Sequence, residues 1–211
     1  MQARLQVALD AITLNGALNL IEKIQDDIDI VEVGTPLLMH YGMNVVEKLF
    51  QNFPKLPVLC DAKIMDAGNY EAGLAFDAGA EYVTVLALAD DLTIQGVTKA
   101  AHDRNKKVVV DLINVTDLNR IEKLEQFGVD VIAIHTGADA QAAGQTPLDD
   151  LKKIRPLVKK ADLAVAGGIK TNTIEKYLKE KPEIIIVGGG ILNQADSVAA
   201  AHKLHQAIQR G

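Results

Sequence analysis

The stretch Pro57–Lys63, PVLCDAK, is a short apolar run that ends on an acid and a lysine. Seven more runs rich in Val and Ile follow the same plan, with amphipathic segments between them. They are Leu5–Asp10, Ile28–Gly34, Tyr82–Leu88, Val108–Asn114, Val131–Gly137, Leu163–Gly168 and Ile184–Gly190. Runs that are apolar at nearly every position are typical of strands buried on both faces, as in a parallel sheet covered by helices.

The segments between these runs have apolar residues at helical spacing. The clearest are Val45–Phe53, Asn119–Phe127 and Leu148–Lys159. Eight strand–helix units in series leave two options, a closed barrel or an open doubly wound sheet. Closure is favoured at eight strands, because side chains then just fill the interior. The sequence therefore predicts a single (β/α)8 TIM barrel domain over residues 1–211.

Composition narrows the class of protein. Of 211 residues, 48% are hydrophobic, and the net charge is −6, which gives no electrostatic reason to expect nucleic acid or an anionic membrane as partner. The single cysteine, Cys60, excludes an internal disulfide and suits a reducing compartment. Neither a signal-peptide pattern nor an apolar run of about 18 residues is present. We therefore expect a cytoplasmic protein.

The chain is short for this fold, at about 26 residues for each strand–helix unit. The loops that follow the strands must then be short as well. A barrel mouth with short loops is poorly shielded from water, so we expect a partner subunit to cover it.

Polar side chains or glycines close nearly every run. They are Asp10, Glu32, Asp61, Lys63, Asp111, His135, Gly167, Gly168, Gly188, Gly189 and Gly190. In a barrel, strand ends converge on one mouth, where barrel enzymes hold their chemistry. A carboxylate among apolar residues is costly unless it is paired or binds a metal. The alternative for any one acid is a helix cap or a solvated loop, but four acids at matching strand ends favour a shared site.

Asp61 and Lys63 are two residues apart, so in a regular strand both head groups enter the mouth. Asp66 follows in the loop before a helix that Gly68 is expected to begin. Carboxylates on either side of a lysine keep it protonated. The alternative is a purely structural ion pair.

Glu32 and Asp61 lie on adjacent predicted strands and offer the hard oxygen ligands that Mg²⁺ takes alongside water and substrate oxygens. No cluster of His and Cys suggests zinc. His135 is the one histidine that ends a strand, and there it is a natural proton carrier near neutral pH.

The glycines that end runs seven and eight predict a phosphate site. Barrels commonly bind phosphate between these two loops, and glycine lets the backbone amides approach the anion closely. The residues are Gly167, Gly168, Gly188, Gly189 and Gly190. They match neither a P-loop nor a dinucleotide fingerprint, so no nucleotide is expected.

The spacing Asp-x-Lys-x-x-Asp of Asp61, Lys63 and Asp66 resembles the orotidine-monophosphate-decarboxylase superfamily. Within it, the chain resembles the 3-hexulose-6-phosphate synthase family over essentially its full length. The matching segments are LQVALD, DIVEVGTPLL, DAKIMDAG, AGAEYVTVL, VVVDLINV, IHTGADAQAAG, AVAGGI and IVGGGI.

This resemblance implies a Mg²⁺-dependent aldol condensation of formaldehyde with D-ribulose 5-phosphate through a metal-stabilised 1,2-enediolate, and the reverse reaction. It implies that Glu32 and Asp61 hold the metal. Asp10, Lys63, Asp66, Asp111 and His135 would surround the sugar. It also implies a homodimer, in which Asp66 reaches the neighbouring subunit's site.

Two alternatives stay open. The related 3-keto-L-gulonate-6-phosphate decarboxylases usually carry Arg in place of Thr136, Glu in place of Asp111 and Arg in the eighth-strand phosphate loop. All three differences favour the synthase. The chain also departs from the usual synthase pattern at Tyr41, Ile64 and Ala87, and these positions bear on the shape of the site and on substrate preference. The second alternative is a barrel that binds a sugar phosphate without chemistry, which the complete set of acids, lysine and histidine argues against.

Overall fold

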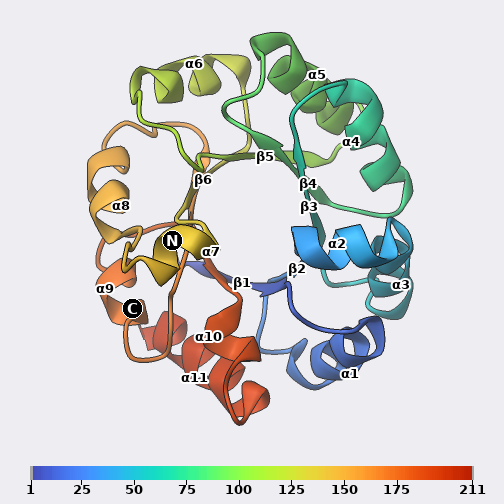
Figure 1. Ribbon diagram of the computed structural model, residues 1–211, viewed down its shortest axis with the longest axis vertical. Helices are drawn as coiled ribbons and strands as arrows, with labels where there is room; N and C mark the ends of the chain where they lie inside the picture. Colours follow the sequence, from blue (N-terminus) through green and yellow to red (C-terminus); the bar gives the residue numbers. More distant parts are fainter. Residues whose placement is uncertain (1, 211) are drawn as a thin grey trace.

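A computed structural model describes residues 2–210, in which eight parallel strands close into one barrel in chain order. Figure 1 shows the strands as a central ring with the helices around it. The strands are β1 Arg4–Leu9, β2 Ile30–Val33, β3 Val58–Ile64, β4 Tyr82–Leu86, β5 Lys107–Asp111, β6 Val131–His135, β7 Asp162–Ala166 and β8 Ile184–Val187. The predicted (β/α)8 TIM barrel is confirmed, and each predicted run overlaps one strand, with ends that differ by at most three residues.

Helices cover the outside of the ring, two of them after each of β2, β6 and β8. They are α1 Leu14–Ile24, α2 Thr35–Tyr41, α3 Asn44–Asn52, α4 Gly68–Asp77, α5 Asp91–His102, α6 Asn119–Phe127, α7 Ala138–Ala142, α8 Leu148–Ile154, α9 Ile174–Leu178, α10 Gly189–Leu192 and α11 Ser197–Arg210. The expected helix end at Lys159 is wrong, because α8 stops at Ile154. Pro156 follows shortly after and has no amide hydrogen with which to continue the helix. No helix in residues 2–210 is both long and apolar enough to span a bilayer.

Two buried layers hold the barrel together. The larger lies between the strands and the helices, and Leu9, Ile21, Leu49, Ile94 and Leu124 are all fully buried in it. The smaller fills the barrel interior towards the amino ends of the strands. Its members are Ile30, Leu59, Tyr82, Val109, Val131, Ala133, Ala164 and Ile184. Burial of large apolar side chains at both faces of each strand explains the continuous apolar runs.

The inward side chains change towards the carboxyl ends of the strands. Small residues, among them Ala8, Ala133 and Ala166, alternate there with polar ones, and a cavity of about 790 Å³ opens between them. The barrel interior is thus packed with apolar side chains at one end and open at the end where the strands terminate.

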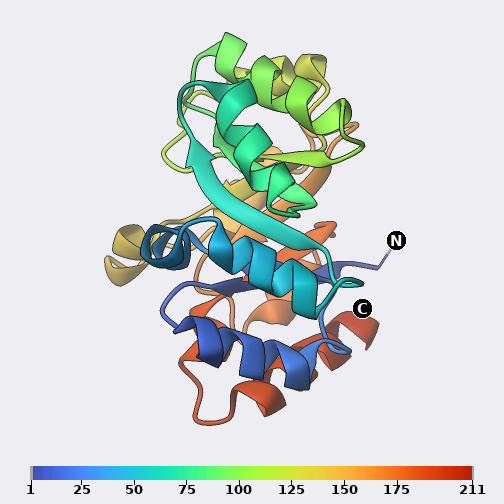
Figure 2. The same cartoon turned by 90° about the vertical axis from the view of Figure 1, so that its right-hand side faces the viewer.

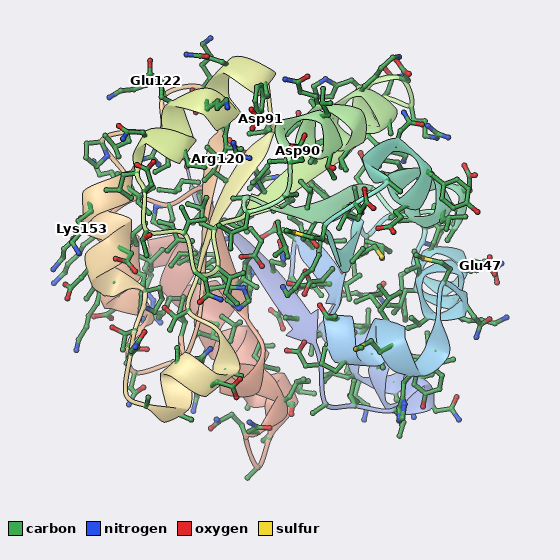
Figure 3. The ribbon with its side chains drawn as sticks, turned by 45° about the horizontal axis from the view of Figure 1, so that its top comes forward. Glu47, Asp90, Asp91, Arg120, Glu122 and Lys153 are labelled. Atoms are coloured by element: carbon green, nitrogen blue, oxygen red, sulfur yellow. The ribbon has the colours of Figure 1, made fainter. Side chains whose placement is uncertain are left out.

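An arginine braces the rim of this mouth. Arg120 at the start of α6 donates to the carbonyl oxygens of Ala87 at 2.8 Å and Ala89 at 3.0 Å, and pairs with Asp91. Figure 3 shows Arg120 beside Asp91, between α6 and the start of α5. Arg120 therefore fixes the loop that follows β4.

Helices α4 and α5 pack side by side (Figure 2). A Cβ built on Gly68 would lie 2.2 Å from the carbonyl oxygen of Thr93. A Cβ on Gly73, in the same helix, would meet only the Arg104 Nη2 atom, at 3.5 Å. The first glycine is therefore required by packing, whereas the second is not.

We predict that Gly68→Ala lowers the free energy of unfolding by about 1–3 kcal/mol, as overpacking does. Gly73→Ala, its matched control, should be neutral or stabilising by about 0.5–1 kcal/mol, because alanine favours a helix interior. Urea denaturation of the two variants measures both values. Equal effects of the two substitutions would contradict the packing argument.

Candidate active site

The strand-end side chains line one shared cavity at the carboxyl ends of the strands. It is lined by Asp10, Glu32, Asp61, Lys63, Asp111, His135, Gly167, Gly168, Gly188, Gly189 and Gly190. Among the residues predicted to bind or act on the sugar or the metal, Asp66 alone lies outside this lining. Groups far apart in the chain are thus brought together because each ends its own strand.

The backbone at Lys63 is not the regular strand that the sequence predicted. Three residues of β3 lie between Cys60 and Ile64, where β4 has only one between their partners Val83 and Val85, so β3 bulges. Lys63 takes a left-handed conformation with φ of 46°. The expected proximity still holds, since the Lys63 Nζ atom lies 3.0 Å from Asp61 Oδ1 and 2.9 Å from Oδ2. The bulge, rather than simple alternation, brings the two groups together.

A charged chain crosses the cavity from β3 to β6. The Lys63 Nζ atom lies 2.8 Å from Asp111 Oδ2, and the same oxygen lies 2.9 Å from His135 Nδ1. Burial alone would raise the pKa of Asp111, but His135 and Lys63 outweigh it and lower the pKa to about 2. Burial alone would lower the pKa of Lys63, but Asp61 and Asp111 raise it above its ordinary value. Asp111 is therefore ionised and Lys63 protonated at neutral pH.

The ionised Asp111 fixes the tautomer of His135. A carboxylate only accepts, so the Nδ1 atom of His135 must carry the proton in this contact. In the neutral ring the other nitrogen, Nε2, is then an acceptor. Nε2 makes no hydrogen bond with residues 2–210, and His135 lines the cavity. In the neutral tautomer, Nε2 is thus available to a ligand.

Glu32 and Asp61 form a second feature, a pair of buried acids on adjacent strands. Burial and then the charge of Asp61 raise the pKa of Glu32 to about 8. Gln6 donates to Glu32 Oε2 at 2.6 Å, while Oε1 accepts no hydrogen bond from the described residues. The pKa of Asp10 is raised as well, by burial and by Asp61. These acids therefore resist ionisation in the metal-free site, and a bound cation would stabilise their charged forms.

The donor set fits Mg²⁺, which takes one or two carboxylates and completes its shell with water and substrate oxygens. Glu32 and Asp61 would hold the ion. Within residues 2–210 no cluster of three or more His, Cys, Asp or Glu side chains forms a metal centre from protein ligands alone.

Asp66 is exposed and lies beyond the bulge, outside the cavity of its own chain. Its carboxylate accepts a hydrogen bond from the amide of Ala67 at 2.7 Å. It does not touch Lys63 in this chain, so the expected Asp–Lys–Asp alternation is absent within one subunit. Lys63 is flanked by Asp61 and Asp111 instead.

Backbone packing in the last two loops requires glycine at some positions, independently of any ligand. Gly167 has φ of 127°, and a Cβ there would lie 2.8 Å from the carbonyl oxygen of Thr136. A Cβ on Gly190 would lie 2.1 Å from the carbonyl oxygen of Ile169. The amide of Gly168 donates to no acceptor in the described part of the chain. The two loops are thus packed tightly, and Gly168, whose amide has no acceptor among the described residues, lines the cavity.

Several cavity residues were not anticipated. They are Gln6, Thr35, Thr84, Gln141, Lys170 and Asn193. Gln6 and Thr84 could have been found from the sequence, because each is a polar residue between apolar neighbours in a predicted strand. Side chains two positions apart in a strand share a face, so each of the two shares the inward face of its strand. The other four lie in loops or short helices, where no periodicity marks the inward side.

The raised pKa of Glu32 makes stability depend on pH. The folded protein keeps the Glu32 proton up to pH about 8, whereas the unfolded chain loses it near 4.5, so the free energy of unfolding falls across this interval. We predict that Glu32→Gln stabilises the metal-free protein at pH 8, by about 1.4 kcal/mol for each unit of pKa shift removed, and has little effect near pH 4.5. Urea denaturation in EDTA at both pH values measures this.

Glu22→Gln, at an exposed position of α1, is the matched control and should change little at either pH. A Glu32→Gln variant that is less stable than the wild type at pH 8 would show that Glu32 is not destabilised by burial.

Comparison with known proteins identifies the family to which the chain belongs. The orotidine 5'-phosphate decarboxylase / HUMPS family model matches residues 3–204. The 3-hexulose-6-phosphate synthase of Bacillus subtilis is 43% identical over 208 residues, 98% of this chain and 99% of its own. The solved structure of 3-hexulose-6-phosphate synthase from Salmonella typhimurium is 47% identical with a TM-score of 0.96, and the match covers 98% of this chain and 99% of that one. KGPDC from Streptococcus mutans is 27% identical with a TM-score of 0.91, and covers 99% and 98%. The chain belongs to the orotidine 5'-phosphate decarboxylase / HUMPS family.

Proposed function

We propose that this chain is a 3-hexulose-6-phosphate synthase, a cytoplasmic lyase that condenses formaldehyde with D-ribulose 5-phosphate and catalyses the reverse cleavage. The observation that carries the proposal is the juxtaposition, in one cavity, of the Glu32–Asp61 acid pair and the chain Lys63–Asp111–His135. The names of the relatives at 43% and 47% identity support it over the full length. KGPDC from Streptococcus mutans, at 27% identity, was solved in complex with a D-pentose 5-phosphate, which supports a ligand of that class here.

The substrate would lie with its phosphate on the loops after β7 and β8 and its reacting end near the acids. Gly168, Gly189 and Gly190 line that side of the cavity and offer backbone amides to the anion. Glu32, Asp61 and Asp111 come from β2, β3 and β5, away from the glycine loops after β7 and β8, and would repel a phosphate. These charges favour the orientation with the phosphate at the glycine loops. Binding at a group remote from the reaction holds the reacting atoms in place.

Glu32 and Asp61 would hold Mg²⁺ near the reacting end of the sugar. When bound, the ion supplies a Lewis acid that polarises the carbonyl oxygen of the substrate. Thr35 and Thr84 each donate to Asp61 at 2.8 Å, which fixes the orientation of its carboxylate. Gln6 does the same for Glu32.

His135 would move the proton. Its Nε2 accepts the proton from C1 of ribulose 5-phosphate, and the electron pair of the broken C–H bond becomes the enediolate. C1 then attacks the carbonyl carbon of formaldehyde, which forms the new carbon–carbon bond, and the proton returns to the new alkoxide. Lys63 stays protonated through the cycle and offsets the negative charge on the sugar oxygens. Asp111 keeps the imidazole in the required tautomer and stabilises its charged form.

A decarboxylase acting on 3-keto-L-gulonate 6-phosphate would use the same acids and the same enediolate. The relatives called KGPDC are 26–27% identical to this chain, against 43–47% for two of the synthases. Release of carbon dioxide from that substrate, without formaldehyde turnover, would favour the decarboxylase. Binding of ribulose 5-phosphate with no turnover of either substrate would favour a barrel without chemistry.

We predict that the purified protein consumes formaldehyde only when ribulose 5-phosphate is present, and that EDTA abolishes this activity until Mg²⁺ is restored. Asp61→Asn should lower kcat/KM by roughly 100-fold or more, because it removes a ligand of the ion that stabilises the developing charge. A coupled assay of formaldehyde consumption measures both. Asp149→Asn, on the exposed first turn of α8, is the matched control. Full activity in EDTA would contradict the metal-dependent mechanism.

We also propose a homodimer in which Asp66 completes the partner's site. Asp66→Asn and His135→Asn should each lose most activity, and an equal mixture of the two, dissociated and reassociated, should regain about a quarter of all sites. His135→Asn mixed with Asp61→Asn is the control, because both residues serve their own chain's cavity and no complete site can form. A first mixture as inactive as the control would place Asp66 outside the partner's site.

A further inference from the structure

The left-handed turn at Lys63 leaves its amide without a neighbour on the strand ladder. β3 and β4 are in register at Cys60↔Val83 and again at Ile64↔Val85, so the residues between them have lost their regular partners. An amide buried without an acceptor would destabilise the bulge. The side chain of Thr84 meets this need, since its Oγ1 atom accepts from the Lys63 amide at 2.9 Å.

The same hydroxyl reaches Asp61. Thr84 Oγ1 lies 2.8 Å from Asp61 Oδ1. A hydroxyl has one proton and two lone pairs, and the amide of Lys63 already donates to it. The hydroxyl proton is therefore free to point at the carboxylate, which can only accept. A single oxygen thus joins the backbone of Lys63 to the head group of Asp61.

Thr84 is 5% exposed and lies on β4 between Val83 and Val85, opposite the bulge. Valine has the same shape without the hydroxyl, so the sequence of β4 would satisfy packing equally well with a third valine there. Thr98 gives a contrast within the chain. It is equally buried, at 5% exposed, but its hydroxyl donates to the carbonyl oxygen of Ile94 within its own helix, at 2.9 Å.

We propose that Thr84 is a positioning residue that holds the bulge of β3 in its active shape, so that the Asp61 carboxylate and the Lys63 ammonium face the same ligand. This inference rests on the proposed function, in which Asp61 holds the ion and Lys63 offsets the charge on the sugar. Without the hydroxyl, the Lys63 amide loses its acceptor and Asp61 loses one of its donors. The backbone can then relax towards a regular strand, which moves the ammonium away from Asp61 and Asp111.

Thr84→Val removes the hydroxyl at constant shape, Thr84→Ser keeps it, and Thr98→Val removes an equally buried hydroxyl outside the cavity. Three readouts apply to each folded variant. They are kcat/KM for formaldehyde and ribulose 5-phosphate, the affinity for Mn²⁺ without sugar by calorimetry, and the hydrogen-exchange rate of the Lys63 amide by NMR. Thermal melts establish that each variant is folded.

Thr84→Val should lose about 10- to 100-fold in kcat/KM, the range for a hydrogen bond to a charged group. It should bind Mn²⁺ more weakly and exchange the Lys63 amide at least about tenfold faster, as loss of the amide's acceptor requires. Thr84→Ser should restore all three values to near those of the wild type, and Thr98→Val should leave them unchanged. If Thr84→Val does not fold, the proposal is judged on Thr84→Ser together with Thr84→Ala.

Unchanged exchange of the Lys63 amide in Thr84→Val overturns the proposal. Faster exchange with unchanged kcat/KM and Mn²⁺ affinity also overturns it, because Thr84 would then stabilise the strand without positioning the site. A wild type that neither turns over the sugar nor binds Mn²⁺ removes the proposed function instead. The exchange rates of the three variants then decide alone whether Thr84 holds the bulge.

Discussion

The burial of three carboxylates, Glu32, Asp61 and Asp111, close to Lys63 is the constraint on which this structure depends, and a fourth acid, Asp10, lies half-buried beside them. Lys63 pairs with Asp61 and Asp111, but Glu32 and Asp10 have no cation of their own and both have raised pKa values. Without a cation these two acids therefore resist ionisation, and a bound cation would stabilise their charged forms. Such a mouth is poorly suited to an apolar ligand and well suited to a divalent cation with a polyhydroxylated substrate. The apolar floor and the helix-covered outer faces supply the stability that makes this arrangement possible.

Uncharged side chains set the geometry of the charges. Gln6, Thr35 and Thr84 each donate to a carboxylate, and none adds charge to the cavity. Such groups orient an acid without neutralising it, so its affinity for a cation is kept. Asp111 shows the opposite design, because Lys63 and His135 hold it ionised and occupied. The cavity thus contains two kinds of acid. Glu32 and Asp61 can bind a ligand, whereas Asp111 positions His135.

The fold was predictable because apolar runs at regular intervals report burial directly, and the strand ends followed from it. The polar residues at those ends, from Asp10 to Gly190, were predictable for the same reason. The bulge at Lys63 was not, since a left-handed lysine leaves no mark on hydrophobic periodicity. Lys170 and Asn193 were missed because loops carry no period, and Gln141 because α7 is only five residues long. What sequence reasoning could not supply is local backbone geometry fixed by tertiary contacts.

The central claim, that Glu32 and Asp61 hold a divalent cation at the mouth of this barrel, is tested most directly by anomalous diffraction from crystals soaked with Mn²⁺. The account predicts one strong peak within bonding distance of a carboxylate oxygen of each residue. A peak bound to other side chains, or none at saturating Mn²⁺ with ribulose 5-phosphate present, would contradict it.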